Sequence, residues 1–265
     1  MPELPEVERT VRQLRPAMEG ARFARVGLRR RRLRTRLPPR FDTRLAGATV
    51  RALARRGKYI VVELSTSATL VMHLGMSGSF DVRRSDIPVS AHDHVIFYMS
   101  NGFVVVFNDP RRFGSMWLYD GAGPRGNPTG ALGPEPLDDA FGAEVLAPAL
   151  AGRRAPLKSA LSDQRVVAGL GNIYVAEALH RARLSPYRPA GTLVGPSGAP
   201  KPELRALVRA IRATLVAALT DDDNDERLRV YDREGERCGR RGCGGTIQRV
   251  VQAGRSTFYC PRCQR

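Results

Sequence analysis

Four cysteines near the end of the 265-residue chain form its most specific chemical pattern. They are the only cysteines, and they follow a C-x4-C-x16-C-x2-C spacing at Cys238, Cys243, Cys260 and Cys263. Two short knuckles joined by a spacer of hairpin length bring four thiolates around one Zn2+ ion. Two disulfides are the alternative, but the opening residues contain no apolar secretion signal, and disulfides are rare in a reducing compartment. We therefore expect one structural zinc ion without an open coordination position.

The N-terminus is a second candidate for chemistry. Pro2 follows Met1, and methionine is normally removed before so small a residue, which leaves a secondary amine at the chain end. An α-amino group has a reference pKa of about 7.7–8.0, so part of it is unprotonated near neutral pH and can attack an aldehyde-like carbon to form an iminium. Glu3 and Glu6 place two carboxylates beside this amine. Taken alone, these residues also describe a capped helix start with acids near the positive end of its dipole.

The net charge predicts a polyanionic partner. Lys and Arg number 43 against 26 Asp and Glu, a balance of +17, and a protein that neutralises phosphates gains affinity by releasing their counterions. Only three of the basic residues are lysines, as a GC-rich genome would produce, but such codon bias does not explain the excess over acids. The basic residues concentrate in 22–58 and 227–265, with an acidic patch at 221–226. Two basic regions at opposite ends favour a groove shared between two lobes.

Apolar periodicity predicts the elements that must position these residues. An apolar helix face is indicated by spacings of three or four between Leu4, Val7, Val11, Leu14 and Met18. Short β-branched and aromatic runs then predict an antiparallel sandwich or barrel, with strands at Tyr59–Leu64, Thr69–Leu74, Val95–Met99, Phe103–Phe107 and Ser115–Tyr119.

The second half of the chain has a helical pattern. A stretch dense in Gly and Pro, residues 121–136, is the best candidate for a linker. Helices are predicted after it at about 138–150, 156–162, 173–183 and 202–219. No apolar run approaches the ~20 residues that a membrane span needs, so we expect a protein without a membrane partner.

Seven sequence blocks occur in a recognisable order from end to end. They are PELPEVE, RRGKYIVVEL, HLGMSGSF, HDHV, NDPRRFG, DQRVVAGLGNIYVAEAL and GRSTFYCPRC. In these blocks the chain resembles the formamidopyrimidine-DNA glycosylase (Fpg) family. The related Nei-type glycosylases usually have Gly where this chain has Leu4, so the resemblance is to the Fpg branch.

The resemblance implies an α+β fold of two domains. An N-terminal helix and antiparallel β-sandwich would form a catalytic domain at 1–120, followed by an interdomain linker at 121–136. A helical helix-two-turn-helix domain would span 137–226, and a zinc-binding β-hairpin would span 227–265. We expect a monomer that binds damaged double-stranded DNA.

The family's chemistry implies roles for six residues. Its members remove an oxidised purine and then cut the DNA at the abasic sugar. By resemblance, Pro2 attacks C1′ and carries the Schiff base, while Glu3 protonates the opening sugar ring. Lys58 has a proton-transfer role in β-elimination; as a lone charge in a basic run it would simply be solvated. Arg255, on the zinc hairpin, grips the phosphates and acts in δ-elimination. Glu6 and Glu177 would orient the site.

A target base must leave the duplex before it can react, and a side chain must fill the gap. The resemblance assigns this wedge to Met76, Arg111 and Phe113, with Arg111 facing the orphaned cytosine. Glycines around Met76 and Phe113 suggest tight turns that expose them, although a core role is the default for such side chains. Contacts to the DNA backbone are implied for His73, His92, Arg153 and Asn172, the last at the start of a helix.

One segment departs from the family pattern. The family usually has about twenty residues of Gly-, Ser- and Thr-rich loop between the helix near 202–219 and the zinc hairpin, whereas this chain has only TDDDNDE before RLRVYDREG. In the family this loop caps an everted 8-oxoguanine, so either the enzyme lacks that cap or the sequence omits part of the native chain. Without the cap, we expect abasic sites and formamidopyrimidines to be processed better than 8-oxoguanine opposite cytosine. The first zinc knuckle, CGRRGC, is also two residues longer than usual, which four thiolates should tolerate.

Two other functions stay open. A Nei-like glycosylase for oxidised pyrimidines is favoured by the absent cap and disfavoured by PELPE. A catalytically weak binder of damaged DNA could keep the wedge and the zinc hairpin, but the presence of Pro2, Glu3, Lys58 and Arg255 together argues against it. We expect a cytoplasmic, nucleoid-associated bacterial enzyme.

Overall fold

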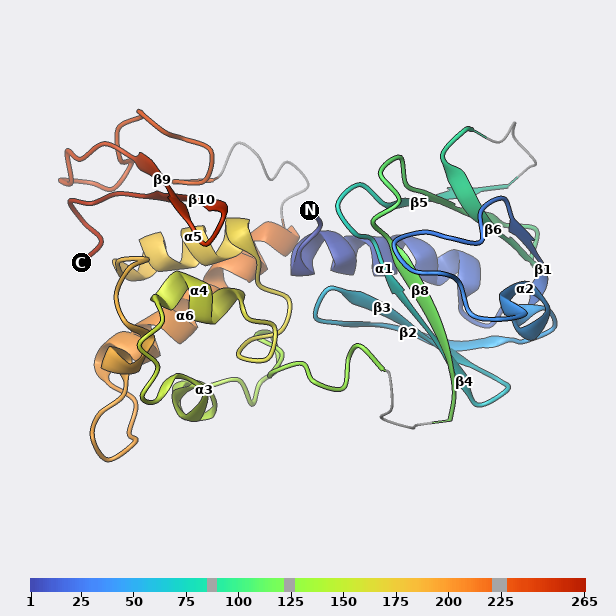
Figure 1. Ribbon diagram of the computed structural model, residues 1–265, viewed down its shortest axis with the longest axis horizontal. Coiled ribbons are helices and arrows are strands. Elements are labelled where there is room, and N and C mark those ends of the chain that lie inside the picture. The colour runs from blue at the N-terminus through green and yellow to red at the C-terminus, as the bar shows by residue number, and fades with distance from the viewer. Residues whose placement is uncertain (85–89, 122–126, 221–227) are drawn as a thin grey trace. The chain divides into compact units, whose positions relative to one another are not determined.

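The computed structural model describes residues 1–84, 90–121, 127–220 and 228–265. The chain divides into two compact units, Met1–Gly130 and Ala131–Arg265, and each is described by itself (Figure 1). Among the described residues, no helix is long and apolar enough to cross a membrane. The finer division of the chain into a linker at 121–136, a helical domain at 137–226 and a zinc hairpin at 227–265 stays a prediction.

The first unit begins with helix α1 (Leu4–Met18). Its apolar face is the one predicted, because the side chains at the three- and four-residue spacings are fully buried. Burial of each such side chain contributes about 1.5–3 kcal/mol. The helix contacts β2 and β3 of one sheet and β5 and β7 of the other, so it joins both sheets to one core.

Two four-stranded antiparallel sheets complete this unit. One has the order β1 (Phe23–Leu28), β6 (Asp93–Met99), β7 (Val104–Asn108) and β5 (Ser79–Arg83). The other has the order β2 (Val50–Arg56), β3 (Tyr59–Leu64), β4 (Ala68–His73) and β8 (Ser115–Asp120). A short helix, α2 (Phe41–Leu45), contacts β1.

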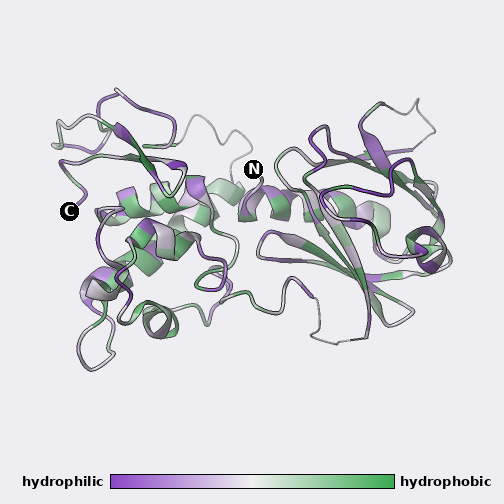
Figure 2. Cartoon of the chain, in the orientation of Figure 1, coloured by the Kyte–Doolittle hydropathy of each residue, from purple (hydrophilic) through white to green (hydrophobic). Residues whose placement is uncertain are grey.

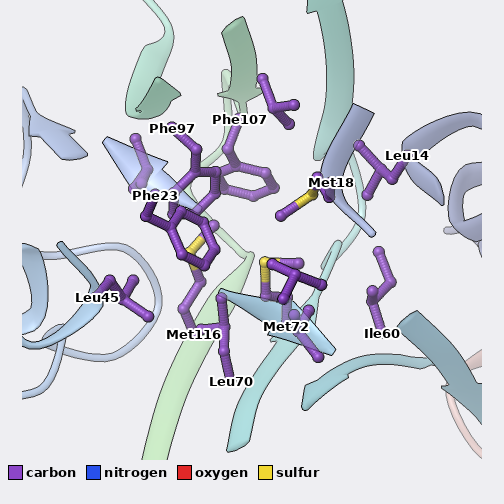
Figure 3. Close-up of a cluster of buried hydrophobic side chains, with 14 of the residues drawn as sticks. Leu14, Met18, Phe23, Leu45, Ile60, Leu70, Met72, Phe97, Phe107 and Met116 are labelled. Atoms are coloured by element: carbon purple, nitrogen blue, oxygen red, sulfur yellow. The ribbon is translucent and has the colours of Figure 1, made fainter. Parts of the chain in front are cut away.

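The core of this unit lies between the sheets. Phe23, Phe97 and Phe107 from one sheet meet Met72 and Met116 from the other (Figure 3). Strand β3 alternates strictly between buried and less buried residues, which is the period of a strand with one face in the core. The predicted antiparallel sandwich is confirmed.

The periodic pattern missed three strands, β1, β2 and β5. The register of β1 shifts between Phe23 and Arg25 and that of β2 between Val50 and Ala52, which breaks the two-residue period, while β5 carries only two apolar side chains, Phe80 and Val82. On β1, Arg25 lies 3.9 Å from the ring centroid of Tyr98 on β6. Such a stacked guanidinium covers a sheet as an apolar side chain would.

The second unit is helical and ends in a hairpin. Its helices are α3 (Ala143–Leu150), α4 (Leu157–Ser162), α5 (Asn172–Ala182) and α6 (Pro202–Thr220), with a 3-10 turn, η1, at Ala190–Leu193. The hairpin pairs β9 (Gln248–Gln252) with β10 (Arg255–Tyr259). The α5 helix is central, because it contacts α4, α6 and β10. Figure 2 colours much of these helices as apolar.

The predicted start of the first of these helices was wrong by five residues. The sequence pattern placed it at 138, whereas α3 begins at Ala143. Gly142, with an extended backbone (φ −136°), is the residue before the helix and ends the turn that precedes it.

Candidate active site and zinc centre

The N-terminal residues form a reciprocally bonded helix start. Glu3 is the N-cap of α1 and is 2% exposed. The Glu3 side chain accepts the backbone N–H of Glu6, and Glu6 Oε2 accepts the N–H of Glu3 at 2.8 Å. The capped helix start is therefore real, but it also holds the peptide that follows Pro2 and keeps both carboxylates beside it. Pro2 itself is half-buried.

Lys58 lies in the tight turn between β2 and β3. Arg56 pairs with Tyr59 across this turn, and Gly57 supplies the positive φ (56°) that a two-residue hairpin loop requires. The side chain of Lys58 is only 6% exposed. The interpretation of Lys58 as a solvated charge in a basic run is thus wrong.

His73 ends β4 and pairs with Tyr59, whose ring centroid is 4.9 Å from the imidazole. Burial, followed by the charges of Lys58 and Arg34, lowers the pKa of His73 to about 4, so the ring is neutral near pH 7. Its Nδ1 accepts the N–H of Gly75 at 3.0 Å. The single ring proton must then be on Nε2, where it can be donated to a phosphate oxygen.

Met76 and Phe113 lie on two loops that touch through their backbones. A Cβ at Gly75 (φ +70°) would lie 2.3 Å from the carbonyl carbon of Phe113, so only glycine fits there. Met76 is 45% exposed and Phe113 40%, which excludes a core role for either in this unit. The Arg111 guanidinium lies 4.8 Å from the Phe113 ring centroid. The three wedge residues are therefore exposed together on adjoining loops.

Asp109, which sequence reasoning missed, ties these loops together. Its buried carboxylate accepts the hydroxyl of Ser77 through Oδ1 and the N–H of Gly114 through Oδ2, both at 2.7 Å. Ser77 Oγ in turn accepts the N–H of Arg111 at 3.3 Å. The backbone N–H of Asp109 donates to the carbonyl of His92, a residue whose side chain is exposed. The sequence signal that could have revealed this role is an aspartate in a turn, NDPRRFG, that also contains Gly114.

The four cysteines converge on one centre in the second unit. Their Sγ atoms lie within 4.8 Å of one another, with Cys238 and Cys263 at 3.9 Å and Cys243 and Cys260 at 3.6 Å. A tetrahedron with Zn–S bonds of about 2.3 Å has edges of about 3.8 Å. The spacing thus fits one tetrahedral zinc ion and is far too long for disulfides.

Other groups orient these thiols. The pKa of Cys243 is lowered, first by the N–H of Gly245, which donates to its sulfur. His180 Nε2 lies 3.3 Å from Cys238 Sγ. Burial, then Arg240 and other arginines, lower the pKa of His180 to about 4, so its ring is neutral near pH 7 and can donate one N–H to a metal-bound thiolate. The cysteine spacing gave no indication that His180, a residue of α5, would lie beside one of the thiols.

The remaining predicted residues lie around α5. Asn172 is its first residue, and its Nδ2 donates to the carbonyl of Ser256 at 3.0 Å. The buried carboxylate of Glu177 accepts three backbone N–H groups, from Arg229, Val230 and Tyr231, at 2.9–3.0 Å. Glu177 thus holds the segment that leads into the zinc hairpin.

The two predicted arginines of this unit lie on different elements. Arg153 forms an ion pair with Asp163 at 3.6 Å. Arg255 is exposed and begins β10 directly after the turn at Ala253–Gly254, so it lies beside the tip of the hairpin.

Known proteins match the chain over its whole length. Three family models cover it: the formamidopyrimidine-DNA glycosylase N-terminal domain at 1–116, the corresponding H2TH domain at 132–229, and a zinc finger found in FPG and IleRS at 235–265. The chain belongs to the formamidopyrimidine-DNA glycosylase family. This membership confirms the fold class, the enzyme class and the structural zinc expected from the sequence.

Individual members agree with this assignment. Formamidopyrimidine-DNA glycosylases of Rhodopseudomonas palustris (strain BisB18) and Beijerinckia indica are 50% and 48% identical, with full coverage of both chains. The Lactococcus lactis enzyme, solved non-covalently bound to DNA containing an AP site, has a TM-score of 0.88 at 30% identity and 99% coverage of both chains. MutM (Fpg) of Thermus thermophilus has a TM-score of 0.83 at 37% identity, covering 99% of this chain and 98% of its own.

Some relatives have residues that this Fpg family member lacks. The alignment with the Rhodopseudomonas protein spans 293 positions, 28 more than the 265 residues of the chain. The short segment that the sequence singled out, 221–226, lies outside the described residues.

Removing the Asp109 carboxylate should loosen both wedge loops. In Asp109→Ala, the Gly114 N–H and the Ser77 hydroxyl lose their buried acceptor, and each unsatisfied group costs about 1–3 kcal/mol. Urea unfolding followed by Trp117 fluorescence should show this loss. As a matched control, Asp81→Ala removes an exposed carboxylate of the same unit that pairs with Arg83, and should cost less than about 1 kcal/mol. Equal stability of the two variants would contradict the role of Asp109.

Zinc removal should act on the second unit alone. Chelation should release one zinc ion per chain and abolish DNA binding, because apparent zinc affinities of about 10 kcal/mol or more contribute to folding of such hairpins. Trp117, the single tryptophan, lies on β8 of the first unit and reports on that unit. Its emission should stay unchanged while fluorescence anisotropy of labelled DNA falls. DNA affinity that survives complete zinc loss would contradict this expectation.

Proposed function

We propose that the chain is a bifunctional DNA glycosylase and abasic-site lyase of base excision repair, acting on oxidised purines in double-stranded DNA. The observation that carries the proposal is the helix start, where a buried carboxylate at Glu3 and a second at Glu6 flank Pro2. Family membership over the full length supports it. Its relatives are bacterial proteins, and we place the activity in the cytoplasm, at the nucleoid.

The chemistry would begin with removal of Met1. The freed Pro2 nitrogen attacks C1′ of the damaged nucleotide, and the base leaves with the electrons of the glycosidic bond and takes up the proton that the proline nitrogen loses. Glu3 delivers a proton to the ring oxygen as the C1′–O4′ bond opens, which leaves an iminium between Pro2 and C1′. Glu6 holds the peptide after Pro2, so it orients the nucleophile without touching the sugar.

Strand cleavage follows from the iminium, which makes the C2′ protons acidic. Loss of one proton expels the 3′ phosphate, and we assign the associated proton transfer to Lys58. Lys58 is buried, and it differs chemically from the arginines around it, because an amine can change its protonation state and a guanidinium cannot. Arg255 would neutralise the phosphate that leaves in the second elimination.

The DNA would be held open by the wedge. Met76 and Phe113 are exposed apolar side chains on loops that Asp109 makes rigid, as insertion into a base stack requires. Arg111 offers only donors, which suits the carbonyl of an orphaned cytosine. His73, His92, Arg153 and Asn172 would contact the backbone.

Borohydride trapping tests the nucleophile. Reduction should link the enzyme covalently to a duplex with an abasic site, and intact mass should show a chain without Met1. A form with a tag before Met1 keeps the Pro2 nitrogen in a peptide bond, so trapping should fall at least about 100-fold. Pro2→Gly should also trap poorly, whereas Pro39→Gly, at an exposed loop proline, should trap normally.

The outcomes of this test separate the alternatives. Normal strand cleavage by the tagged form would overturn the proposal, and binding without trapping would indicate a non-catalytic protein. Preferential trapping on thymine glycol would favour the Nei-like function instead.

The short segment after α6 predicts the order of substrates. Single-turnover rates should be at least about tenfold higher on abasic sites and formamidopyrimidines than on 8-oxoguanine opposite cytosine, since each 1.4 kcal/mol of lost recognition costs a factor of ten. The Rhodopseudomonas relative, with its longer chain, serves as the control. Comparable rates on all three substrates would remove the basis for this expectation.

A further inference from the structure

The described part of the second unit buries a lysine that none of the assigned roles uses. Lys158 of α4 is 4% exposed. Its Nζ donates to the carbonyl of Ser256 at 2.8 Å and to Thr257 Oγ1 at 2.6 Å, both on β10. Neither of these two partners is charged, and a buried ammonium that has no carboxylate partner among the described residues is costly. In this structure the buried lysine holds Ser256 and Thr257 of the hairpin in place.

The same carbonyl is held from a second helix. Asn172, at the start of α5, donates its Nδ2 to Ser256 at 3.0 Å. One peptide oxygen of β10 therefore receives donors from both α4 and α5. This carbonyl belongs to the residue that directly follows Arg255 in β10, so the two donors hold the strand one residue beyond the point from which the Arg255 side chain extends.

Other contacts already attach the hairpin to the helices. Phe258 and Ile247 pack with Ala176 of α5, and the four cysteines converge on the zinc centre of the same hairpin. Lys158 instead acts at the Arg255 end, where it lines a cavity of about 290 Å³ together with Arg255, Asp163 and Gln252. This position fits a role in placing Arg255 better than a general role in attaching the hairpin to the helices.

We propose that Lys158 is a positioning residue for the second elimination step, acting through the Ser256 carbonyl to hold Arg255 against the departing phosphate. The proposal rests on the proposed function. In that step a proton leaves C4′ and its electron pair neutralises the conjugated iminium to a dienamine. The dienamine electrons then return to form the C4′=C5′ bond and restore the iminium, while the C5′–O5′ bond breaks with its electrons on the 5′ phosphate. The guanidinium of Arg255 neutralises that phosphate. Water then hydrolyses the iminium and frees Pro2.

The charges around Lys158 make this clamp sensitive to pH. Burial, and then the charge of Arg255, lower the pKa of Lys158 to about 8. Asp163 lines the same cavity but is paired with Arg165 at 3.0 Å and with Arg153 at 3.6 Å, and the neighbouring Thr257 and Gln252 are neutral. As pH rises through 8, Lys158 loses its proton, and its bonds to β10 lose their charge assistance.

The test measures the ratio of two products on a duplex with a preformed abasic site. A 5′-labelled strand ends in an unsaturated aldehyde after β-elimination alone and in a phosphate after δ-elimination. In Lys158→Met, the δ share should fall about tenfold or more, since a small misplacement of a catalytic group costs that much. Lys158→Arg, which keeps the charge, should restore part of it, and Arg255→Gln should lower the δ share without a further loss in the double variant.

Lys201 provides the matched control. Its Nζ also donates to a backbone carbonyl, that of Thr192, at 2.8 Å, but this hydrogen bond is exposed and lies on another part of the unit. Lys201→Met should keep the wild-type product ratio. In the wild type the δ share should drop with an apparent pKa near 8, and this step should be absent in Lys158→Met.

The outcomes distinguish the two proposals. If the wild type gives no trapped iminium, the proposed function fails. If trapping is normal but Lys158→Met, with its zinc retained, has the wild-type product ratio, the role of Lys158 is overturned. Should Lys158→Met not fold, Thr257→Val decides, because it removes one acceptor of the lysine and should lower the δ share in the same direction; an unchanged ratio would overturn the proposal.

Discussion

A buried charge or polar group must recover from the protein the hydrogen bonds that it loses with water, and this constraint organises the candidate site. Asp109 recovers them from Gly114 and Ser77, Glu177 from three successive N–H groups, and Lys158 from Ser256 and Thr257. In each case the partners belong to the loop or strand that carries a proposed DNA contact or leads into it. Burial of one side chain thus fixes the path of a functional segment.

This arrangement explains how exposed groups can be held in place. Met76 and Phe113 are themselves exposed, yet their loops are joined by the close approach at Gly75 and by the Asp109 carboxylate. Arg255 likewise follows a turn but precedes a peptide that two helices hold. Groups fixed before the DNA arrives lose little conformational entropy on binding, which favours affinity and catalysis alike.

The positive charge has more than one use. Some arginines replace apolar packing or pair with acids, as Arg25 does over Tyr98 and Arg55 with Glu8. Others adjust nearby groups, since Arg34 helps to keep His73 neutral. Only part of the +17 is thus available for phosphates, and the exposed remainder would affect the salt dependence of binding more than its specificity.

The sequence by itself determined the features that depend on local spacing: the helix at 4–18, the five apolar strands, the helices of the second half and the four zinc ligands. Its blocks also determined the family. Strands β1 and β2 escaped because register shifts break their two-residue period, and β5 because it carries only two apolar side chains; α3 begins later than its pattern predicted, directly after Gly142. Only the tertiary structure decided that Lys58 is buried, that Asp109 joins two loops, that His180 supports a cysteine and that Lys158 holds β10. The physical reason is distance along the chain: Lys158 and Ser256 are 98 residues apart, and no periodicity records which buried group will meet which backbone partner after folding.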